Sequence, residues 1–208
     1  MSASSGLSVP IHLITNLGDA AVLAPATLAL LVILFWFGSR ADAFAFSLAV
    51  AVCFVATLLA KIAFAVCSAQ PALDGIRSPS GHTGYSAVFY GCLSVQIATG
   101  RTTGQRFFLY GAAASLVGLI GLSRVVVRAH NRLEVAVGLA IGGICIVLFC
   151  LLREQSQRLV LPPKAIVLIS LLILVSLLDA VFLAGRWTAE PLIETIARSI
   201  GASLGLCR

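Results

Sequence analysis

Two histidines stand in polar stretches where apolar runs of the chain begin. His82 follows "RSPSG", and His130 precedes "NRLE". Histidine can act as a nucleophile or a general acid because its pKa lies near neutrality. If a helix begins at or before Asn131, His130 and Glu134 share one face of it, and a carboxylate against one ring nitrogen leaves the other free to attack. We therefore predict a nucleophile at His130, oriented by Glu134, and a general acid at His82.

The residues around these histidines are suited to hold an anion. Ser80 and Gly81 stand at the predicted start of a helix, where backbone N–H groups and the positive end of the helix dipole attract negative charge. Lys61, Arg77 and Arg124 add cations at the ends of apolar runs, and arginine offers a bidentate fork for phosphate oxygens. The chemistry that this set predicts is phosphate binding.

The spacing of these residues resembles a known family. "PSGH" at 79–82, and "SR" at 123–124 followed by five residues and His130, resemble the second and third signature motifs of the type 2 phosphatidic acid phosphatase superfamily, which includes vanadium haloperoxidases. Lys61 resembles the lysine that opens the first motif. The resemblance covers residues 61–134 by motif and about 14–152 by layout.

The resemblance implies a mechanism without a metal or another cofactor. His130 would attack phosphorus to give a phosphohistidine, and His82 would protonate the leaving group and later activate water. Lys61, Arg124 and the Ser80 and Gly81 groups would hold the equatorial oxygens, where phosphoryl transfer gains most of its stabilisation.

The sequence departs from the family pattern at two positions. The first motif has an arginine seven residues after its lysine, and Ser68 occupies that position here; Arg77 is the candidate replacement. The third motif usually ends in aspartate, and Glu134 keeps that charge with one more methylene. These departures concern rate and substrate more than the class of reaction.

The elements that carry these residues are predicted to cross a membrane. Of the 208 residues 60% are hydrophobic and only 11% are charged, and the mean hydropathy is +1.06. A soluble domain with so few charges would lack an adequate surface. The fold class predicted is an all-α polytopic transmembrane bundle with about six spans and a C-terminal amphipathic helix. The six spans are 20–39, 43–60 with an apolar continuation to 67, 80–99, 107–123, 133–152 and 165–185.

Short polar connections between the spans predict one domain over residues 1–208, with antiparallel neighbours. Its parts are a motif-bearing core at roughly 14–152, an extra span at 165–185 and an interfacial helix at roughly 187–206. Gly138 and Gly142, together with the small residues 111–115, are predicted to let helices approach closely. The stretch 11–20 is expected to be a short interfacial helix.

The remaining polar and sulfur-containing residues receive structural interpretations. Cysteines within the spans are expected to be small apolar fillers, namely Cys53, Cys92, Cys145 and Cys150. Cys67 and Cys207 would lie on one side of the membrane, and the sequence leaves open whether they pair. Asp179 is expected to make a polar contact with neighbouring helices.

The function predicted is hydrolysis of a lipid phosphate or diphosphate at a membrane surface. The partners expected are this substrate and membrane lipids, with no nucleic acid; the oligomeric state stays open. Two alternatives remain, namely phosphoryl transfer to another lipid or sugar, and a non-catalytic anion-binding or transport protein. The start of the chain has no Lys or Arg before Arg40, which favours an outward-facing site in the cytoplasmic membrane of a bacterium.

Overall fold

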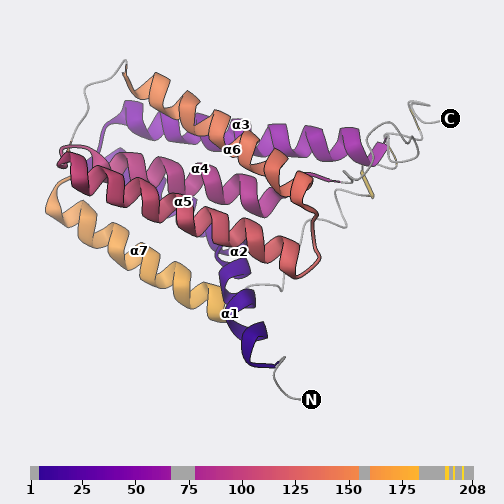
Figure 1. Cartoon of the computed structure of the whole chain (residues 1–208). Helices are drawn as coiled ribbons and strands as arrows, with labels where there is room; N and C mark the ends of the chain where they lie inside the picture. Colours follow the sequence, from indigo (N-terminus) through magenta and orange to yellow (C-terminus); the bar gives the residue numbers. More distant parts are fainter. Residues whose placement is uncertain are drawn as a thin grey trace.

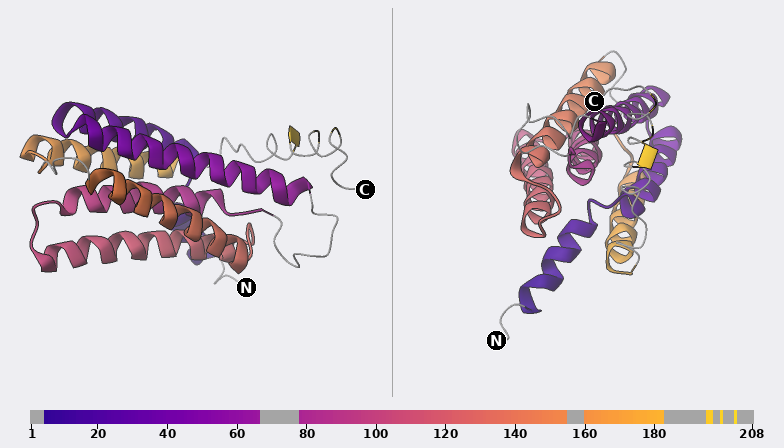
Figure 2. Two further views of the ribbon diagram at one scale, coloured as in Figure 1. Left: turned by 90° about the horizontal axis from the view of Figure 1, so that it is seen from above. Right: turned by 90° about the vertical axis from the view of Figure 1, so that its right-hand side faces the viewer.

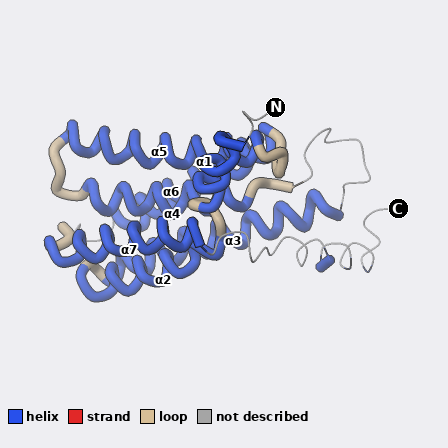
Figure 3. Tube along the Cα trace, turned by 90° about the horizontal axis from the view of Figure 1, so that it is seen from below, coloured by secondary structure: helices blue, strands red, loops and turns tan. Residues whose placement is uncertain are grey.

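The computed structural model describes residues 5–66, 78–154 and 160–182, with single helical residues at 195, 196, 199 and 203. Every extended regular element in these ranges is an α-helix, and Figure 3 draws no strand in them. The helices are α1 (Ser5–Asn16), α2 (Ala20–Phe37), α3 (Arg40–Val66), α4 (Gly81–Ala98), α5 (Thr103–Val126), α6 (Arg132–Glu154) and α7 (Pro163–Phe182). The all-α class is therefore confirmed.

Four of these helices, α2, α3, α5 and α6, are long and apolar enough to cross a hydrocarbon core. The apolar part of α7 within the described residues is shorter, and α4 is not among the four. The six predicted spans correspond in order to α2 through α7, while the number that cross the membrane stays a prediction for α4 and α7. The predicted C-terminal amphipathic helix, Cys67 and Cys207 fall outside the described residues.

The position of α4 explains its lower hydropathy. It lies in the middle of the bundle, in contact with α2, α3, α5 and α6 (Figure 1). Most of its residues are buried, including the polar side chains of Thr83, Ser86, Ser94 and Gln96. Because protein and not lipid surrounds this helix, it can carry hydroxyl and amide groups that a lipid-facing span could not.

Close packing of α6 on α4 depends on two glycines. A Cβ atom at Gly138 would lie 2.5 Å from the carbonyl oxygen of Ser80, and one at Gly142 would lie 2.7 Å from that of Gly84. The GxxxG pair therefore lets the two backbones meet, as predicted. This contact holds the first turn of α6 beside the first turn of α4.

The small residues of α5 do not make the contact expected of them. Gly111 has no neighbour within 4 Å of a Cβ position, and Ala112, Ala114 and Ser115 are exposed. The prediction that 111–115 brings helices together is wrong, because α5 and α6 diverge from their connecting loop toward the start of α5 (Figure 1). Small side chains permit close packing but do not show which face meets a partner.

A buried ion pair joins three helices at the end of the bundle away from the histidines. Arg153 Nε on α6 donates to Asp42 Oδ1 on α3 at 3.0 Å, and Gln96 Nε2 on α4 donates to Asp42 Oδ2 at 3.3 Å. Arg153 Nη2 also donates to the hydroxyl of Thr99 at 2.8 Å. Arg153 is therefore an internal residue and not a loop cation.

The bundle is completed by α1 and α7 on one side. α7 packs along α2, and α1 runs obliquely away from the other helices toward the N-terminus (Figure 2). The corner between α1 and α2 is anchored inward, because Tyr90 donates to the carbonyl of Leu17 and Thr15 donates to the hydroxyl of Ser123. Cys53, Cys92 and Cys145 lie in the apolar core, as expected of fillers.

Candidate active site

His130 and Glu134 meet as predicted, although not on one helical face. His130 is buried in the loop before α6, and its Nδ1 lies 3.1 Å from Glu134 Oε2. α6 begins only at Arg132, so His130 precedes the cap residue Asn131. The two side chains meet because Glu134 reaches back to the helix start, which leaves Nε2 of the ring directed away from the carboxylate.

Glu134 reaches back because it belongs to a capping box. The Asn131 side chain accepts from the backbone N–H of Glu134 at 2.9 Å, and Glu134 Oε2 accepts from the backbone N–H of Asn131 at 2.9 Å. Such reciprocal bonds satisfy donors that a helix start otherwise leaves open. Glutamate is the preferred acid at the third position of this arrangement, which gives the departure from aspartate a physical reason.

The turn after α5 returns the chain toward Arg124. Arg128 has a φ of 57°, the left-handed conformation that usually follows a helix end. The N–H of Ala129 donates to the carbonyl of Arg124 at 3.0 Å, and the N–H of Arg128 donates to that of Val125 at 3.1 Å. These bonds form a Schellman motif. The N–H of His130 also donates to the Arg124 carbonyl at 3.2 Å, so the spacing between "SR" and His130 is the length of this turn.

Glu134 also connects the two motif-bearing segments. Its Oε1 accepts from the backbone N–H of Ser78 at 2.9 Å, and its carbonyl accepts from the N–H of Ser80 at 3.0 Å. The "PSGH" segment is thereby held against the start of α6 at two points. Although the two segments are far apart in the chain, a single residue sets the position of one relative to the other.

The start of α4 carries the predicted anion-binding groups. Ser80 is fully buried, its N–H is donated to Glu134, and its hydroxyl lies 2.9 Å from that of Thr83. Gly81 begins the helix, so its N–H and those of the next two residues belong to the first turn, which has no acceptor within the helix. Lys61 is buried beside them, since its Cε would lie 3.7 Å from a Cβ atom at Gly81.

His82 has a partner that the sequence did not indicate. Its Nε2 lies 3.4 Å from Oδ2 of Asp19, whose side chain is only 7% exposed. Asp19 is the N-cap of α2, and its other oxygen accepts from the N–H of Ala21 at 2.9 Å. An acidic residue just before an apolar run, on the membrane face that carries the motifs, is the signal by which Asp19 could have been found.

The environment of Asp19 favours its ionised form. Burial acts to raise the pKa of this carboxyl, but hydrogen bonding to His82, the backbone N–H of Ala21, and the charges of His82 and Arg124 outweigh it and lower the pKa. Asp19 therefore supplies a negative charge at neutral pH.

The structure brings most of the predicted residues to one end of the bundle. Contacts join His130, Glu134 and Ser80, while Lys61 lies beside Gly81 and Asp19 contacts His82. The backbone carbonyl of Arg124 accepts from the N–H of His130. Arg77 and the side chain of Asp179 fall outside the described residues. Arg128 and Arg132, which flank His130, are exposed.

These features define a class of protein: a helical bundle with four helices of membrane length, and with two histidines, carboxylates and cations at one end. Residues 62–158 match the family model of the PAP2 superfamily, which confirms the resemblance that the motifs predicted. This match supports phosphatase or phosphotransferase chemistry on phosphate esters. There is no significant match among curated proteins or solved structures.

Proposed function

We propose that the protein is an integral membrane phosphatase that hydrolyses a lipid phosphate or diphosphate through a phosphohistidine. The observation that carries this proposal is the position of Glu134, which contacts Nδ1 of His130 and holds the "PSGH" segment at the same time. A nucleophile with a fixed tautomer thus lies beside a helix start suited to a phosphate.

In the first step, a lone pair on Nε2 of His130 attacks phosphorus and the bond to the leaving oxygen breaks. His82 gives that oxygen its proton. In the second step, His82 takes a proton from water, the water oxygen attacks phosphorus, and the bond between nitrogen and phosphorus breaks. Inorganic phosphate leaves, and both histidines regain their starting states.

The remaining residues act on the charge of the phosphoryl group. Lys61, Arg124 and the first-turn amides of α4 stabilise the equatorial oxygens. Ser80 positions the helix start, because its N–H is already donated to Glu134. Asp19 orients the His82 ring through Nε2, which leaves Nδ1 to exchange the proton. Arg77 keeps its assignment as the replacement for the arginine absent at position 68.

The position of the site supports a lipid substrate. The residues of the site stand at one end of a bundle whose helices have membrane length, so a phosphate in the headgroup zone reaches them while its hydrocarbon chain stays in lipid. A water-soluble phosphate ester would gain nothing from this arrangement.

The test is release of inorganic phosphate by purified protein from a panel of lipid phosphates and diphosphates. Wild type should turn over at least one of them, and His130→Ala should abolish turnover while keeping the helical circular dichroism spectrum. An acid-labile, base-stable phosphoenzyme should form on His130. Full activity in folded His130→Ala would refute the proposed nucleophile, and a phosphorylated acceptor in place of free phosphate would identify a phosphotransferase.

Inhibition provides a second test of the same chemistry. Vanadate adopts the trigonal bipyramid of an in-line transfer, so it should inhibit competitively. EDTA should leave activity unchanged if the histidines and cations of this chain do all the chemistry. Loss of activity on chelation, with recovery on adding back one metal ion, would contradict the metal-independent mechanism.

A further inference from the structure

A cavity of about 970 Å³ lies between α4, α5 and α6. It is distinct from the candidate active site, because none of the residues assigned to that site lines it. Most of the residues that line it are apolar or small, and Gly91, Gly118 and Gly143 are among them. At the end of the bundle away from the histidines, the lining includes Thr99 and Arg106. The cavity therefore combines an apolar body with a polar mouth.

The inner end of the cavity is closed toward the active site. Ala87, Val117 and Leu139 line that end, one from each helix. One helical turn nearer the histidines, the same three helices meet: a Cβ atom at Gly121 would lie 2.9 Å from Val135 and 3.4 Å from Thr83. Because the helices touch there, a chain that lies in the cavity enters from the far end of the bundle and not from the active site.

The depth of the cavity matches one leaflet of a bilayer. Along α4 it extends from Ala87 to Thr99, a distance of about 18 Å at 1.5 Å per residue. One half of a hydrocarbon core is about 15 Å. A single extended hydrocarbon chain from the leaflet opposite the active site thus has both the length and the polarity that the cavity accepts.

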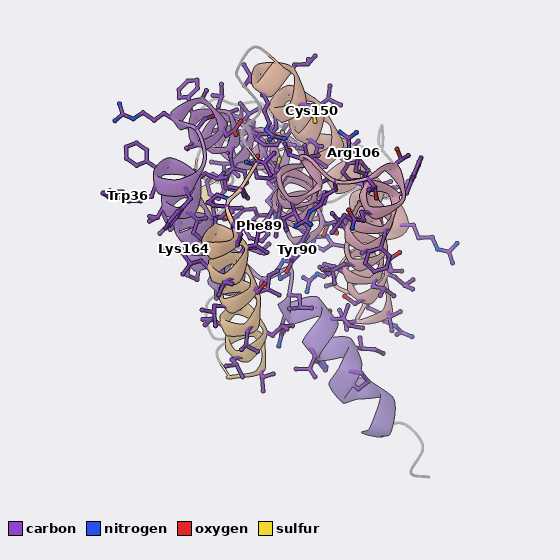
Figure 4. All side chains as sticks on the ribbon, turned by 90° about the vertical axis from the view of Figure 1, so that its left-hand side faces the viewer. Trp36, Phe89, Tyr90, Arg106, Cys150 and Lys164 are labelled. Carbon is purple, nitrogen blue, oxygen red and sulfur yellow. The ribbon has the colours of Figure 1, made fainter. Side chains whose placement is uncertain are left out.

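The charge at the mouth indicates the headgroup. Arg153 also lines the cavity, but Asp42 neutralises it within the protein. Arg106 is exposed and has no acidic neighbour in a salt bridge among the described residues. Figure 4 looks onto this end and shows Arg106 and Cys150 on the α5 and α6 side, away from Lys164 and Trp36. The mouth therefore presents one net positive charge, that of Arg106.

From these observations we propose that the cavity binds one anionic phospholipid of the opposite leaflet, with a chain between α4, α5 and α6 and its phosphate at Arg106. This site is separate from the proposed reaction and does not depend on it. Filling the apolar body should remove the lipid, and removing the charge should remove the preference for an anionic headgroup.

The experiment is native mass spectrometry of the full-length protein after exchange into micelles that contain equal amounts of dioleoylphosphatidylglycerol and dioleoylphosphatidylcholine. Wild type should retain one lipid and favour phosphatidylglycerol about fivefold, the factor expected from one basic residue near a membrane surface. Arg106→Gln should abolish this preference. Arg101→Gln, which removes an exposed charge at the same end but outside the cavity lining, should keep it.

Gly118→Phe tests the apolar body, because a Cβ atom there has no neighbour within 4 Å and the ring can enter the cavity. Gly111→Phe is the matched control, since Gly111 is equally open on the same helix but does not line the cavity. The retained lipid should be lost only in Gly118→Phe. Circular dichroism and thermal unfolding verify the fold, and Gly143→Leu replaces Gly118→Phe if that variant fails to fold.

Three outcomes would overturn the proposal. The first is equal lipid retention by folded Gly118→Phe and Gly111→Phe. The second is no preference for phosphatidylglycerol in wild type, or an unchanged preference in Arg106→Gln. The third is that Gly118→Phe keeps phosphatidylglycerol but loses turnover of long-chain and not short-chain lipid phosphates, which would assign the cavity to the substrate.

Discussion

Asp19 and His82 show what motif spacing leaves out at the scale of single residues. Lys61, Ser80, His82, Arg124, His130 and Glu134 could be proposed from the sequence because the family motifs mark them. Asp19 belongs to no such motif and reaches His82 only because the corner between α1 and α2 folds back against α4 and α5. Both residues can be read in the sequence, but their contact could not be predicted because it depends on how this corner packs in the folded protein.

Asp19→Asn should lower kcat/KM by about ten- to a hundredfold, the effect of losing a charge-assisted contact of about 1.5 to 3 kcal/mol. Asparagine is also a good N-cap, so the unfolding midpoint should change little. Unchanged kcat/KM in folded Asp19→Asn would show that Asp19 only caps α2.

Ionisation of Asp19 also affects folding stability at acid pH. Its pKa is lowered in the folded protein, so the stabilisation is complete above the unfolded value near 3.8 and is lost as the pH falls through the folded value. The thermal unfolding midpoint of wild type should therefore fall more steeply below about pH 4 than that of Asp19→Asn. Parallel pH dependence in the two proteins would contradict this linkage.

Arg128 provides a second residue-scale test, because a left-handed conformation costs a non-glycine residue about 1 to 2 kcal/mol. Arg128→Gly should keep activity and leave the unfolding midpoint unchanged or higher. Arg128→Val should lower both, since a β-branched residue resists this conformation and would displace His130. Equal activity and stability in the two variants would show that this turn does not position the histidine.

At the scale of elements, hydropathy predicts where helices lie but not how they face one another. The predicted limits of the spans fall close to those of α2 through α7, since length and polarity decide where a helix can remain in lipid. Two sets of small residues looked alike in sequence, yet only Gly138 and Gly142 lie at a helix contact. The direction in which α5 and α6 diverge, which decides this, depends on the whole bundle.

Gly138→Ala tests the contact between α4 and α6. The added methyl group would meet the Ser80 carbonyl at 2.5 Å, and backbone cannot rotate away as a side chain can. We expect a loss of about 1 to 3 kcal/mol in unfolding free energy. A fall in kcat should accompany it, because Glu134 and the start of α4 shift apart. Gly143→Ala on the same helix, where a Cβ meets nothing within 4 Å, should behave as wild type.

At the scale of the whole molecule, the burial of Arg153 affects the comparison of positive charge on the two faces of the bundle, which indicates which face lies in the cytoplasm. The six-span topology predicted from the sequence assigns six Lys and Arg residues to the far face: Arg40, Arg101, Arg106, Arg153, Arg158 and Lys164, of which Arg158 lies outside the described residues. The same predicted topology assigns five to the motif face, apart from the proposed phosphate ligands: Arg128, Arg132, Arg186, Arg198 and Arg208, of which the last three lie outside the described residues. Because Arg153 pairs with Asp42 inside the protein, charge counting favours neither face. The prediction of an outward-facing site then rests on Arg40 and on the absence of Lys and Arg from the residues before it.

Single cysteines in a cysteine-free background can decide this orientation. A cysteine at Ser78 lies at the active-site end, and one at Thr103, which is exposed, lies at the other. An impermeant thiol reagent added to intact cells should label only the Ser78→Cys protein. Labelling of Thr103→Cys alone would place the site on the cytoplasmic side, and permeabilised cells provide the control that both positions react.

The ion pair between Asp42 and Arg153 has a consequence for how the chain is assembled. The two residues are 111 positions apart, at the start of α3 and near the end of α6. During synthesis, Asp42 reaches the membrane long before its partner exists, and a charge left unpaired in lipid surroundings is costly. When α6 inserts, Arg153 neutralises the charge of Asp42, and α3, α4 and α6 then pack together around this ion pair. An incomplete chain that stops before α6 therefore carries an unpaired acid, a difference that membrane quality control can detect.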